Sequence, residues 1–325
     1  MNSLNEIASI ISRGDDFTLV AHVSPDGDAL GSMLGLQLIL EAMGKRSQSV
    51  CDGRVPPIYG FLPGAEWIVH ASDARRSRCV IAVDCADKHR MGIAAKLFDA
   101  AETTVAIDHH ATNAGFAQAN YISGGTASTG EIIFELANIM GVAIDSDMAT
   151  CLYTAVLTDT GRFSHSNTTP NSLFTASKLI EAGADASRLN RLIYSNFPCS
   201  KLRMLGRALN LLELFEDGRI GLIAVSQDDM ASVGASNDDC EGIVEHIRDI
   251  DTVEIAVFVR QARDGSYKVS MRSKDYADVA KISERYGGGG HERAAGFTSH
   301  FALPRTRAMI LDAAQKALKK GLAAD

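Results

Sequence analysis

The sequence has few aromatic residues, only scattered cysteines and no long apolar run. Aromatic side chains make up 6% of the 325 residues, and no stretch approaches the roughly 20 apolar residues that span a bilayer. The six cysteines lack the CxxC spacing of zinc or redox motifs, so we expect reduced thiols, most of them buried. The N-terminal segment contains acidic residues and no apolar core, which argues against a signal peptide and predicts a cytoplasmic protein with no membrane partner.

Positive charge is in deficit over the whole chain but not in every part of it. The net charge of −8 disfavours a protein that coats nucleic acid nonspecifically. Residues 255–325 nevertheless hold 13 Lys+Arg against 7 Asp+Glu, a balance of +6 that leaves the first 254 residues at −14. This asymmetry suits a metal-binding half joined to an anion-binding half, although chance segregation between two domains would give the same pattern. The length itself predicts two domains.

The first half alternates short apolar runs with segments of helical periodicity. The runs typical of buried strands are FTLVAHV (17–23), CVIAVDC (79–85) and TTVAIDHH (103–110). Helices are predicted over 29–44, 128–140 and 145–163. Continuous apolar strands separated by helices predict an α/β fold, with a parallel sheet that carries helices on both faces.

The second half changes character along its length. Residues 171–215 are predicted to be helical with an interruption at Pro198, and strands follow from about residue 216. The segment 303–322 is predicted to be an amphipathic basic helix. The expected organisation is a catalytic domain over 1–187, a helical connector over 188–215 and a smaller α/β domain over 216–325.

Polar side chains follow each predicted strand of the first half, and one ends a helix. They are His22, Asp26 and Asp28 after the first run, Asp84 after the second, Asp108, His109 and His110 after the third, and Asp159 near the end of the helix from 145. Ligands of open parallel sheets bind outside the carboxyl ends of the strands, so these side chains are expected to converge. Each cluster alone is explained by a turn, a cap or a surface feature, but four of them favour a shared site.

Bound cations would explain why so many carboxylates gather, because like charges at close range raise one another's pKa values. A mixed set of Asp and His suits a borderline divalent metal such as manganese, whereas calcium and magnesium prefer oxygen ligands and zinc often takes cysteine. Two metals about 3.5–4 Å apart, bridged by one aspartate, would activate a water and neutralise a phosphate. Asp84 stands alone between the other clusters, which makes it the candidate bridge.

A glycine run marks the second half, in the segment GGGGHERAAG (287–296). Four glycines are costly in conformational entropy, which indicates a close backbone approach to a ligand or a left-handed turn rather than a linker. Their N–H groups could form an anion-binding nest, supported by a helix that we expect to begin near Glu292. Upstream, Arg272, Ser270 and Ser273 are side chains suited to phosphate oxygens.

Four segments of the first half, HVSPDGDALGS, VDCAD, DHH and TDTGRF, resemble in their order and spacing the four motifs of the DHH phosphoesterases. The resemblance implies two manganese ions, for which magnesium or cobalt are possible substitutes. It places one ion on His22, Asp26 and Asp84, and the other on Asp28, Asp84, His109 and Asp159. It further implies that His110 contacts the scissile phosphate and that Asp108 orients the histidine pair, so the expected catalytic residues are His110, Asp108 and Asp84.

The second half resembles the DHHA1 domain, whose GGGH motif grips the terminal nucleotide of a substrate. By this resemblance the residues that bind phosphate or base are Gly288, Gly289, Gly290, His291 and Arg272. Together the two halves resemble the NrnA type of this family. That type implies hydrolysis of very short oligoribonucleotides (nano-RNase activity) and of 3′-phosphoadenosine 5′-phosphate (pAp) to AMP. We expect no further oligonucleotide-binding domain, and hence a short substrate held between the two domains.

Three other functions remain open from the sequence. The first is a phosphodiesterase for cyclic or linear signalling dinucleotides such as c-di-AMP, pApA or pGpG. The second is an inorganic pyrophosphatase, which the glycine run disfavours, and the third is a nucleotide-binding regulator, which the complete ligand set disfavours. The sequence does not decide between RNA and DNA as the preferred substrate, or between a monomer and a homodimer.

Overall fold

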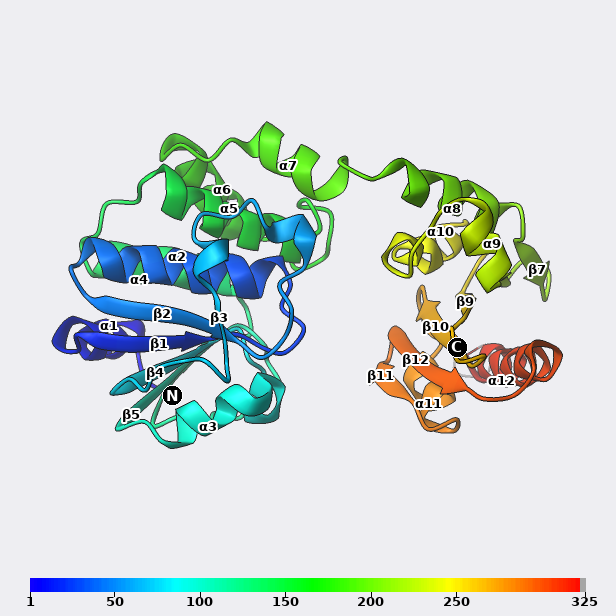
Figure 1. The fold of residues 1–325 in the computed structure, drawn as a ribbon, viewed down its shortest axis with the longest axis horizontal. Helices are drawn as coiled ribbons and strands as arrows, with labels where there is room; N and C mark the ends of the chain where they lie inside the picture. The colour runs from blue at the N-terminus through cyan, green and yellow to red at the C-terminus, as the bar shows by residue number, and fades with distance from the viewer. Residues whose placement is uncertain (322–325) are drawn as a thin grey trace. The chain divides into compact units, whose positions relative to one another are not determined.

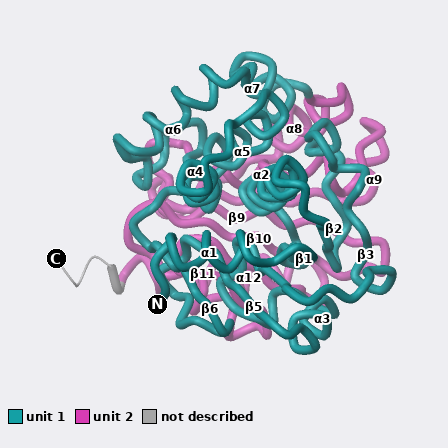
Figure 2. Tube along the Cα trace, turned by 90° about the vertical axis from the view of Figure 1, so that its left-hand side faces the viewer, with its two compact units in different colours: residues 1–196 teal, residues 197–325 magenta. Residues whose placement is uncertain are grey.

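The computed structural model describes residues 1–321 and divides into two compact units, Met1–Asn196 and Phe197–Asp325 (Figure 2). The division falls within the segment predicted to be a connector. Each unit is built around its own six-stranded sheet with helices on both faces (Figure 1). The α/β fold predicted from the sequence is therefore confirmed.

The sheet of the first unit is parallel throughout, because every pair of neighbouring strands runs in the same direction. Its strands in spatial order are β3 (Val69–His70), β2 (Arg46–Cys51), β1 (Asp16–Val20), β4 (Cys79–Val83), β5 (Thr103–Asp108) and β6 (Ala119–Ile122). The order reverses direction at β1, because β2 and β3 lie on one side of it and β4 to β6 on the other. Ligand sites of open α/β sheets form at such a reversal, outside the carboxyl ends of the strands.

Alternate residues of these strands face two different apolar layers. The α-helices of the first unit are α1 (Leu4–Arg13), α2 (Gly27–Ala42), α3 (Ala95–Asp99), α4 (Thr129–Ile139), α5 (Ser146–Asp159), α6 (Pro170–Glu181) and α7 (Ala186–Tyr194). Its 3₁₀ helices are η1 (Pro57–Tyr59), η2 (Ala65–Trp67) and η3 (Lys88–Ala94). Leu19 and Ile81 pack with α2, α4 and α5, whereas Val20 and Val80 pack with η3 and α3. Figure 1 shows α2, α4 and α5 on one face of the sheet and α3 on the other.

Glycines allow α2 and α5 to pack closely. A Cβ at Gly31 would lie 2.4 Å from the carbonyl oxygen of Cys151, and a Cβ at Gly35 would lie 2.7 Å from the side chain of Leu152. Gly27, one turn before Gly31, meets α5 in the same way near its C-terminal end. These glycines recur every four residues, so they form one stripe along α2. The stripe brings the first turn of α2 close to the last turn of α5.

The second unit has a mixed sheet. Its strands in spatial order are β11 (Gly289–His291), β12 (Ala294–Ser299), β10 (Tyr267–Ser273), β9 (Ile255–Gln261), β8 (Ile220–Val225) and β7 (Glu213–Phe215). Only the β8–β9 pair is parallel among the described pairs of this sheet. Its helices are α8 (Cys199–Leu209), α9 (Gln227–Ser232), the 3₁₀ helix η4 (Asp238–Cys240), α10 (Ile243–Arg248), α11 (Val279–Glu284) and α12 (Leu303–Gly321).

The expectation of a helix near Glu292 is wrong. Glu292 and Arg293 form the turn between β11 and β12, which pair in antiparallel register. Glu, Arg and Ala favour helices as isolated residues, but burial of alternate residues of β12 against the unit's core outweighs that preference.

The described helices include none that is long and apolar enough to cross a membrane. All six cysteines are free thiols, as expected, and all except Cys199 are buried.

Candidate metal centre

The strands of the first sheet deliver three of the predicted ligands at its carboxyl edge. Asp84 directly follows β4 and His109 directly follows β5, while His22 lies two residues beyond the end of β1. Because β1, β4 and β5 are adjacent parallel strands, their ends lie side by side. The other three ligands come from helix termini: Asp26 caps α2, Asp28 lies in its first turn, and Asp159 is the last residue of α5.

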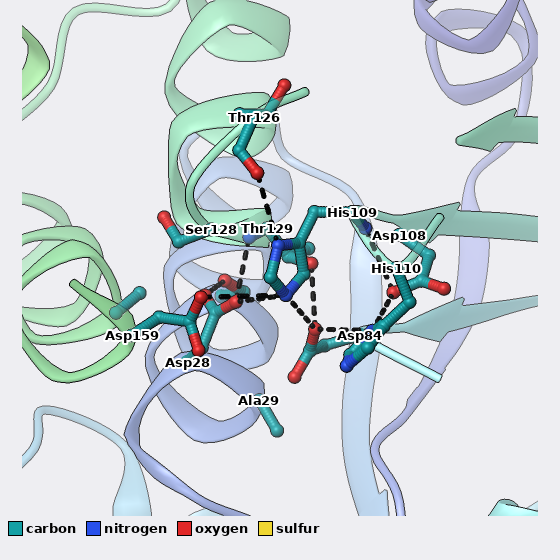
Figure 3. A network of polar contacts seen from close by, with 12 residues as sticks. Asp28, Ala29, Asp84, Asp108, His109, His110, Thr126, Ser128, Thr129 and Asp159 are labelled. Atoms are coloured by element: carbon teal, nitrogen blue, oxygen red, sulfur yellow. Dashed lines mark hydrogen bonds and ion pairs between the residues drawn. The ribbon is translucent and has the colours of Figure 1, made fainter. Parts of the chain in front are cut away.

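The structure brings these six side chains together in groups whose donor atoms all lie within 4.8 Å of one another. One group consists of His22, Asp26 and Asp84, and another consists of Asp28, His109 and Asp159. Figure 3 shows Nε2 of His109 directed at Asp28 and Asp159 of its own group and also at Asp84. The distance from this nitrogen to Oδ1 of Asp84 is 3.6 Å. Asp84 thus faces both groups, with Oδ2 3.8 Å from Nε2 of His22.

The distances within the groups fit ions better than hydrogen bonds. Nε2 of His109 is 3.7 Å from Oδ2 of Asp28 and 3.7 Å from Oδ2 of Asp159, and Nε2 of His22 is 4.0 Å from Oδ1 of Asp26. Hydrogen bonds between nitrogen and oxygen are shorter than about 3.2 Å. Two ligand atoms that both bind the same ion at about 2.1 Å can be up to about 4.2 Å apart. The donor chemistry and the spacing therefore fit divalent cations.

The N-terminus of α4 orients Asp28. The backbone N–H of Thr129 donates to Oδ2 of Asp28 at 2.7 Å (Figure 3). The N–H of Gly130 and the hydroxyl of Ser32 donate to Oδ1 at 3.0 and 2.9 Å. A helix N-terminus favours negative charge because its N–H groups and its dipole point at the anion. These three donors fix the orientation of the Asp28 side chain in an almost fully buried position.

Asp84 is constrained at its backbone and its side chain. Its φ of 57° lies in the left-handed region, which Asp and Asn tolerate better than most residues. Its N–H donates to the carbonyl of Ile107 at 3.0 Å, and the Thr129 hydroxyl donates to Oδ1 at 2.9 Å. This conformation turns the side chain of Asp84 toward both ligand groups.

Asp108 contacts both histidines, since it accepts from the backbone N–H of His109 at 2.9 Å and from the ring of His110. Nδ1 of His110 donates to Oδ1 of Asp108 at 2.7 Å, and Nδ2 of Asn113 donates to Oδ2 at 2.7 Å. The ring of His109 is held instead by the carbonyl of Thr126, 3.2 Å from its Nδ1, which leaves Nε2 directed at the carboxylates (Figure 3). His110 is more exposed than His109.

Burial and mutual repulsion oppose negative charge on the carboxyl groups of this cluster. Burial raises the pKa of Asp84 to about 7, and the charge of Asp26 adds to that effect. Burial, followed by the charge of Asp84, raises the pKa of Asp28 well above its ordinary value, and burial also raises the pKa of Asp159. Burial lowers the pKa of His22, which favours the neutral imidazole that binds metals. A cation would relieve this repulsion.

The pKa values of Asp108 and His110 shift in the opposite directions to those of the other aspartates and of His22. Although burial opposes it, hydrogen bonds from His110 and Asn113 hold the pKa of Asp108 below its ordinary value. The hydrogen bond to Asp108 raises the pKa of His110, which favours a positively charged ring.

Three supporting residues were not identified from the sequence. Thr129 and Asn113 contact Asp84 and Asp108 as described, and Nδ2 of Asn167 lies 3.3 Å from Oδ2 of Asp159. Thr129 lies in the segment STGE (128–131), which is typical of an ordinary helix N-terminus. A signal that could have identified it is the need of buried Asp28 for donors, which a nearby helix N-terminus supplies. No motif or residue spacing in the sequence indicates a role for Asn113 or Asn167.

In the second unit, Arg272 and Ser270 line a cavity of about 510 Å³. They share one face of β10, since alternate residues of a strand point the same way. Arg272 is already paired with Glu245, whose Oε1 is 3.0 Å from Nε. Ser273 lies on the opposite face of β10, where it is 3% exposed, so the structure does not bring it together with the other two.

The glycine run forms the start of the β11–β12 hairpin. Gly288 packs against β12 so closely that a Cβ would lie 2.1 Å from the carbonyl oxygen of Gly296, and Gly290 has a φ of 145°. Gly289 differs, because a Cβ there would meet nothing within 4 Å. Gly289 and His291 are exposed. The fold thus explains two of the glycines in GGGH and leaves the middle one facing open space.

Comparison with known proteins identifies both halves of the chain. The family DHH, N-terminal domain, matches residues 16–156, and the DHHA1 domain matches residues 223–320. The bifunctional oligoribonuclease and PAP phosphatase NrnA of Thermus thermophilus is 32% identical over 283 residues, covering 86% of this chain and 83% of the relative. A probable NrnA of Streptococcus mutans is 29% identical and covers 92% of this chain and 94% of its own length.

A solved structure shares the fold across both units. The exopolyphosphatase-related protein from Bacteroides fragilis superposes with a TM-score of 0.90 at 25% sequence identity, over 96% of this chain and 95% of that one. The resemblance inferred from the four motifs and the glycine run is thus confirmed. The chain belongs to the DHH family of phosphoesterases in its DHH–DHHA1 form, and it is a hydrolase of phosphoester bonds.

Proposed function

We propose that the protein is a manganese-dependent phosphodiesterase and phosphatase that hydrolyses very short oligoribonucleotides and converts pAp to AMP. The observation that carries this proposal is the convergence of two His/Asp groups on Asp84, in a chain similar over most of its length to proteins named for these two activities. The relatives support the substrate class, and the donor set supports the metal.

The proposed ligands of one manganese ion are His22, Asp26 and Asp84. The proposed ligands of the other are Asp28, Asp84, His109 and Asp159. Mixed imidazole and carboxylate donors favour manganese over calcium or magnesium, with cobalt as a possible substitute. Two such cations, when bound, lower the pKa of a water and stabilise the charge that develops on the phosphoryl group.

His110 is the proposed contact to the scissile phosphate. Asp108 holds its Nδ1 and favours the protonated ring, so the Nε2–H group can donate to a phosphate oxygen. Asn113 fixes the other oxygen of Asp108, which keeps this pair in one orientation. His110 therefore presents a hydrogen-bond donor in a fixed orientation where negative charge increases during the reaction.

The second unit is proposed to bind the remainder of the nucleotide through Arg272, Ser270 and the GGGH segment. Arg272 would exchange part of its pairing with Glu245 for a phosphate oxygen, since its guanidinium offers five donors. The exposed backbone at Gly289 allows close approach of a ligand. Ser273 is left out because its side chain lies on the buried face of β10.

Turnover with manganese on 5′-phosphorylated RNA, from dinucleotides to strands of about two dozen nucleotides, and on pAp tests this function. The matched variants are Asp84→Asn, which suits the left-handed backbone, and Asp73→Asn at an exposed aspartate as the control. We expect the shortest oligomers and pAp to react fastest, Asp84→Asn to lower turnover by at least about 100-fold and Asp73→Asn to leave it unchanged.

Preference for long strands would contradict the proposal and indicate a processive exonuclease. Turnover of neither oligomers nor pAp would also contradict it and would direct the assay to c-di-AMP, pApA and pGpG. Equal activity of Asp84→Asn and wild type would exclude Asp84 as a shared ligand.

A further inference from the structure

A cavity of about 260 Å³ lies in the first unit beside the proposed metal ligands. Asp26 and Asp159 border it on the side of the carboxylates, and each belongs to a different ligand group. The remaining lining residues are Ile58, Tyr59, Ile193, Tyr194 and Thr158, and the hydroxyl of Thr158 donates to the carbonyl of Thr154 at 2.9 Å. A molecule in this cavity would therefore lie next to both proposed ions.

The apolar wall comes from two elements that contact each other. Ile58 and Tyr59 belong to η1, and Tyr194 ends α7. The guanidinium of Arg162 lies 4.8 Å from the centre of the Tyr194 ring, a cation–π contact that helps to fix the ring. Ile58 is 39% exposed and belongs to none of the described apolar core clusters. The packing of the fold thus does not account for this isoleucine.

The composition of the cavity disfavours a second phosphate and favours a neutral ring. An anion there would face Asp26 and Asp159, while the nearby Arg162 is directed at Tyr194. A planar heterocycle instead places its faces against aromatic and aliphatic side chains, as bases do in single-strand binding proteins. The volume lies below the 300–1,000 Å³ typical of pockets for whole ligands, so it suits one ring system rather than a dinucleotide.

We infer that this cavity is a nucleobase subsite, which holds the base of the nucleotide whose phosphate is hydrolysed. The inference rests on the proposed function, because it assigns one part of the same substrate. Such a subsite would let the first unit favour nucleotide esters over inorganic phosphate chains, which have no apolar face. Ile58, Tyr59 and Tyr194 are then specificity-determining residues, and Ile58 is the most accessible of them to mutation.

The test compares pAp with its abasic analogue, 1-deoxyribose 3,5-bisphosphate, in manganese. The variants are Ile58→Ala, Ile58→Leu and the control Ile139→Ala, which removes an equally exposed isoleucine at the end of α4 far from its N-terminus. We expect wild type to favour pAp over the analogue by about 5- to 150-fold in kcat/KM, the range of base stacking. Ile58→Ala should lower kcat/KM for pAp about fivefold or more and leave the analogue unchanged.

Ile58→Leu keeps the apolar contact and is expected to retain most of the preference for pAp over the analogue. A folding defect would instead lower kcat/KM for both substrates, so it would not imitate the expected result. Equal kcat/KM of wild type on pAp and on the analogue would overturn the subsite while leaving the proposed function in place. An equal loss on both substrates in Ile58→Ala, or no loss on either, would also overturn it. Absence of wild-type turnover on any nucleotide would instead overturn the proposed function, and the subsite with it.

Discussion

Asp84 follows the last residue of β4 with a φ of 57°, and its side chain faces both ligand groups. A non-glycine residue in the left-handed region costs about 1–3 kcal/mol and persists where the surroundings fix it. The surroundings here are the Ile107 carbonyl, which accepts from its N–H, and the Thr129 hydroxyl, which donates to its Oδ1. Strain, burial and a raised pKa at one aspartate together indicate a functional residue.

Thr129 provides a test at the residue scale. Thr129→Val keeps the shape of the side chain and removes the 2.9 Å hydrogen bond to Asp84. Loss of such a supporting partner is expected to weaken manganese affinity or turnover by about 10- to 100-fold. Titration of manganese against a competing chelator measures the affinity directly.

Thr154→Val is the matched control, because Thr154 is also buried and its hydroxyl donates only to a carbonyl one turn earlier in α5. We expect this variant to bind manganese like wild type. Equal affinity in Thr129→Val and Thr154→Val would contradict a role of Thr129 in positioning Asp84.

The residues that carry the site were predictable from the sequence to different degrees. The positions of Asp84 and His109 follow from apolar runs that end in polar residues, because parallel strands end at one edge. The left-handed backbone of Asp84 and the role of the Thr129 hydroxyl were not predictable, since both depend on contacts between segments far apart in the sequence, at Ile107 and Thr129. Ser273 shows the limit of composition alone, because only the register of β10 places it on the buried face.

At the scale of elements, the contact between α2 and α5 sets the distance between Asp28 and Asp159. A Cβ at Gly31 would lie 2.4 Å from a backbone oxygen of α5, so Gly31→Ala must push the two helices apart. We expect it to lower the free energy of unfolding by about 1–3 kcal/mol and to weaken manganese binding. Denaturant unfolding and metal titration measure the two effects.

Gly206→Ala is the control for this substitution. Gly206 lies within α8, where a Cβ would meet nothing within 4 Å, so alanine is expected to stabilise the protein by about 0.5–1 kcal/mol. A Gly31→Ala protein that is as stable as wild type and binds manganese equally would contradict the account of the α2–α5 contact.

The β11–β12 hairpin provides a second test at this scale. Gly289→Ala meets no atom within 4 Å, so we expect an unchanged melting temperature and a KM for short oligoribonucleotides raised by about 2- to 10-fold, the worth of one hydrogen bond. Gly288→Ala should instead lower the melting temperature, because its Cβ would lie 2.1 Å from the oxygen of Gly296. An unchanged KM in Gly289→Ala would argue against backbone contact with the substrate.

The sequence predicted the long elements better than the short ones. The predicted helix at 29–44 and the strand at 17–23 correspond to α2 and β1, because extended apolar patterns determine such elements. The hairpin after the glycine run was missed because β11 has only three residues and local propensity around Glu292 favours a helix. Its formation depends on pairing with β10, which is far away in the sequence.

At the scale of the whole molecule, stability should depend on pH and metal together. In the metal-free protein the pKa of Asp84 is raised to about 7, above the ordinary value of 3.8. The stability that Asp84 contributes is therefore fully present below about pH 4 and is lost as the pH rises through 7. Manganese requires the ionised carboxylate, so its stabilising effect should increase over the same range.

Melting temperatures at pH 5, 6, 7 and 8, each with a chelator and with manganese, test this dependence. We expect the difference between the two conditions to grow with pH in wild type. Asp84→Asn resembles the protonated carboxyl, so without metal its stability relative to wild type should increase from pH 5 to pH 7 and stay constant between pH 7 and pH 8. A metal effect that is independent of pH would contradict the assigned titration.

Two divalent cations that share Asp84 are the central feature of this account, and anomalous diffraction near the manganese absorption edge tests it most directly. Crystals grown with manganese are expected to show two anomalous peaks about 3.5–4 Å apart, with Asp84 bound to both. His22 and Asp26 should bind one of them, and Asp28, His109 and Asp159 the other. A single peak, or two peaks that do not share Asp84, would contradict the account.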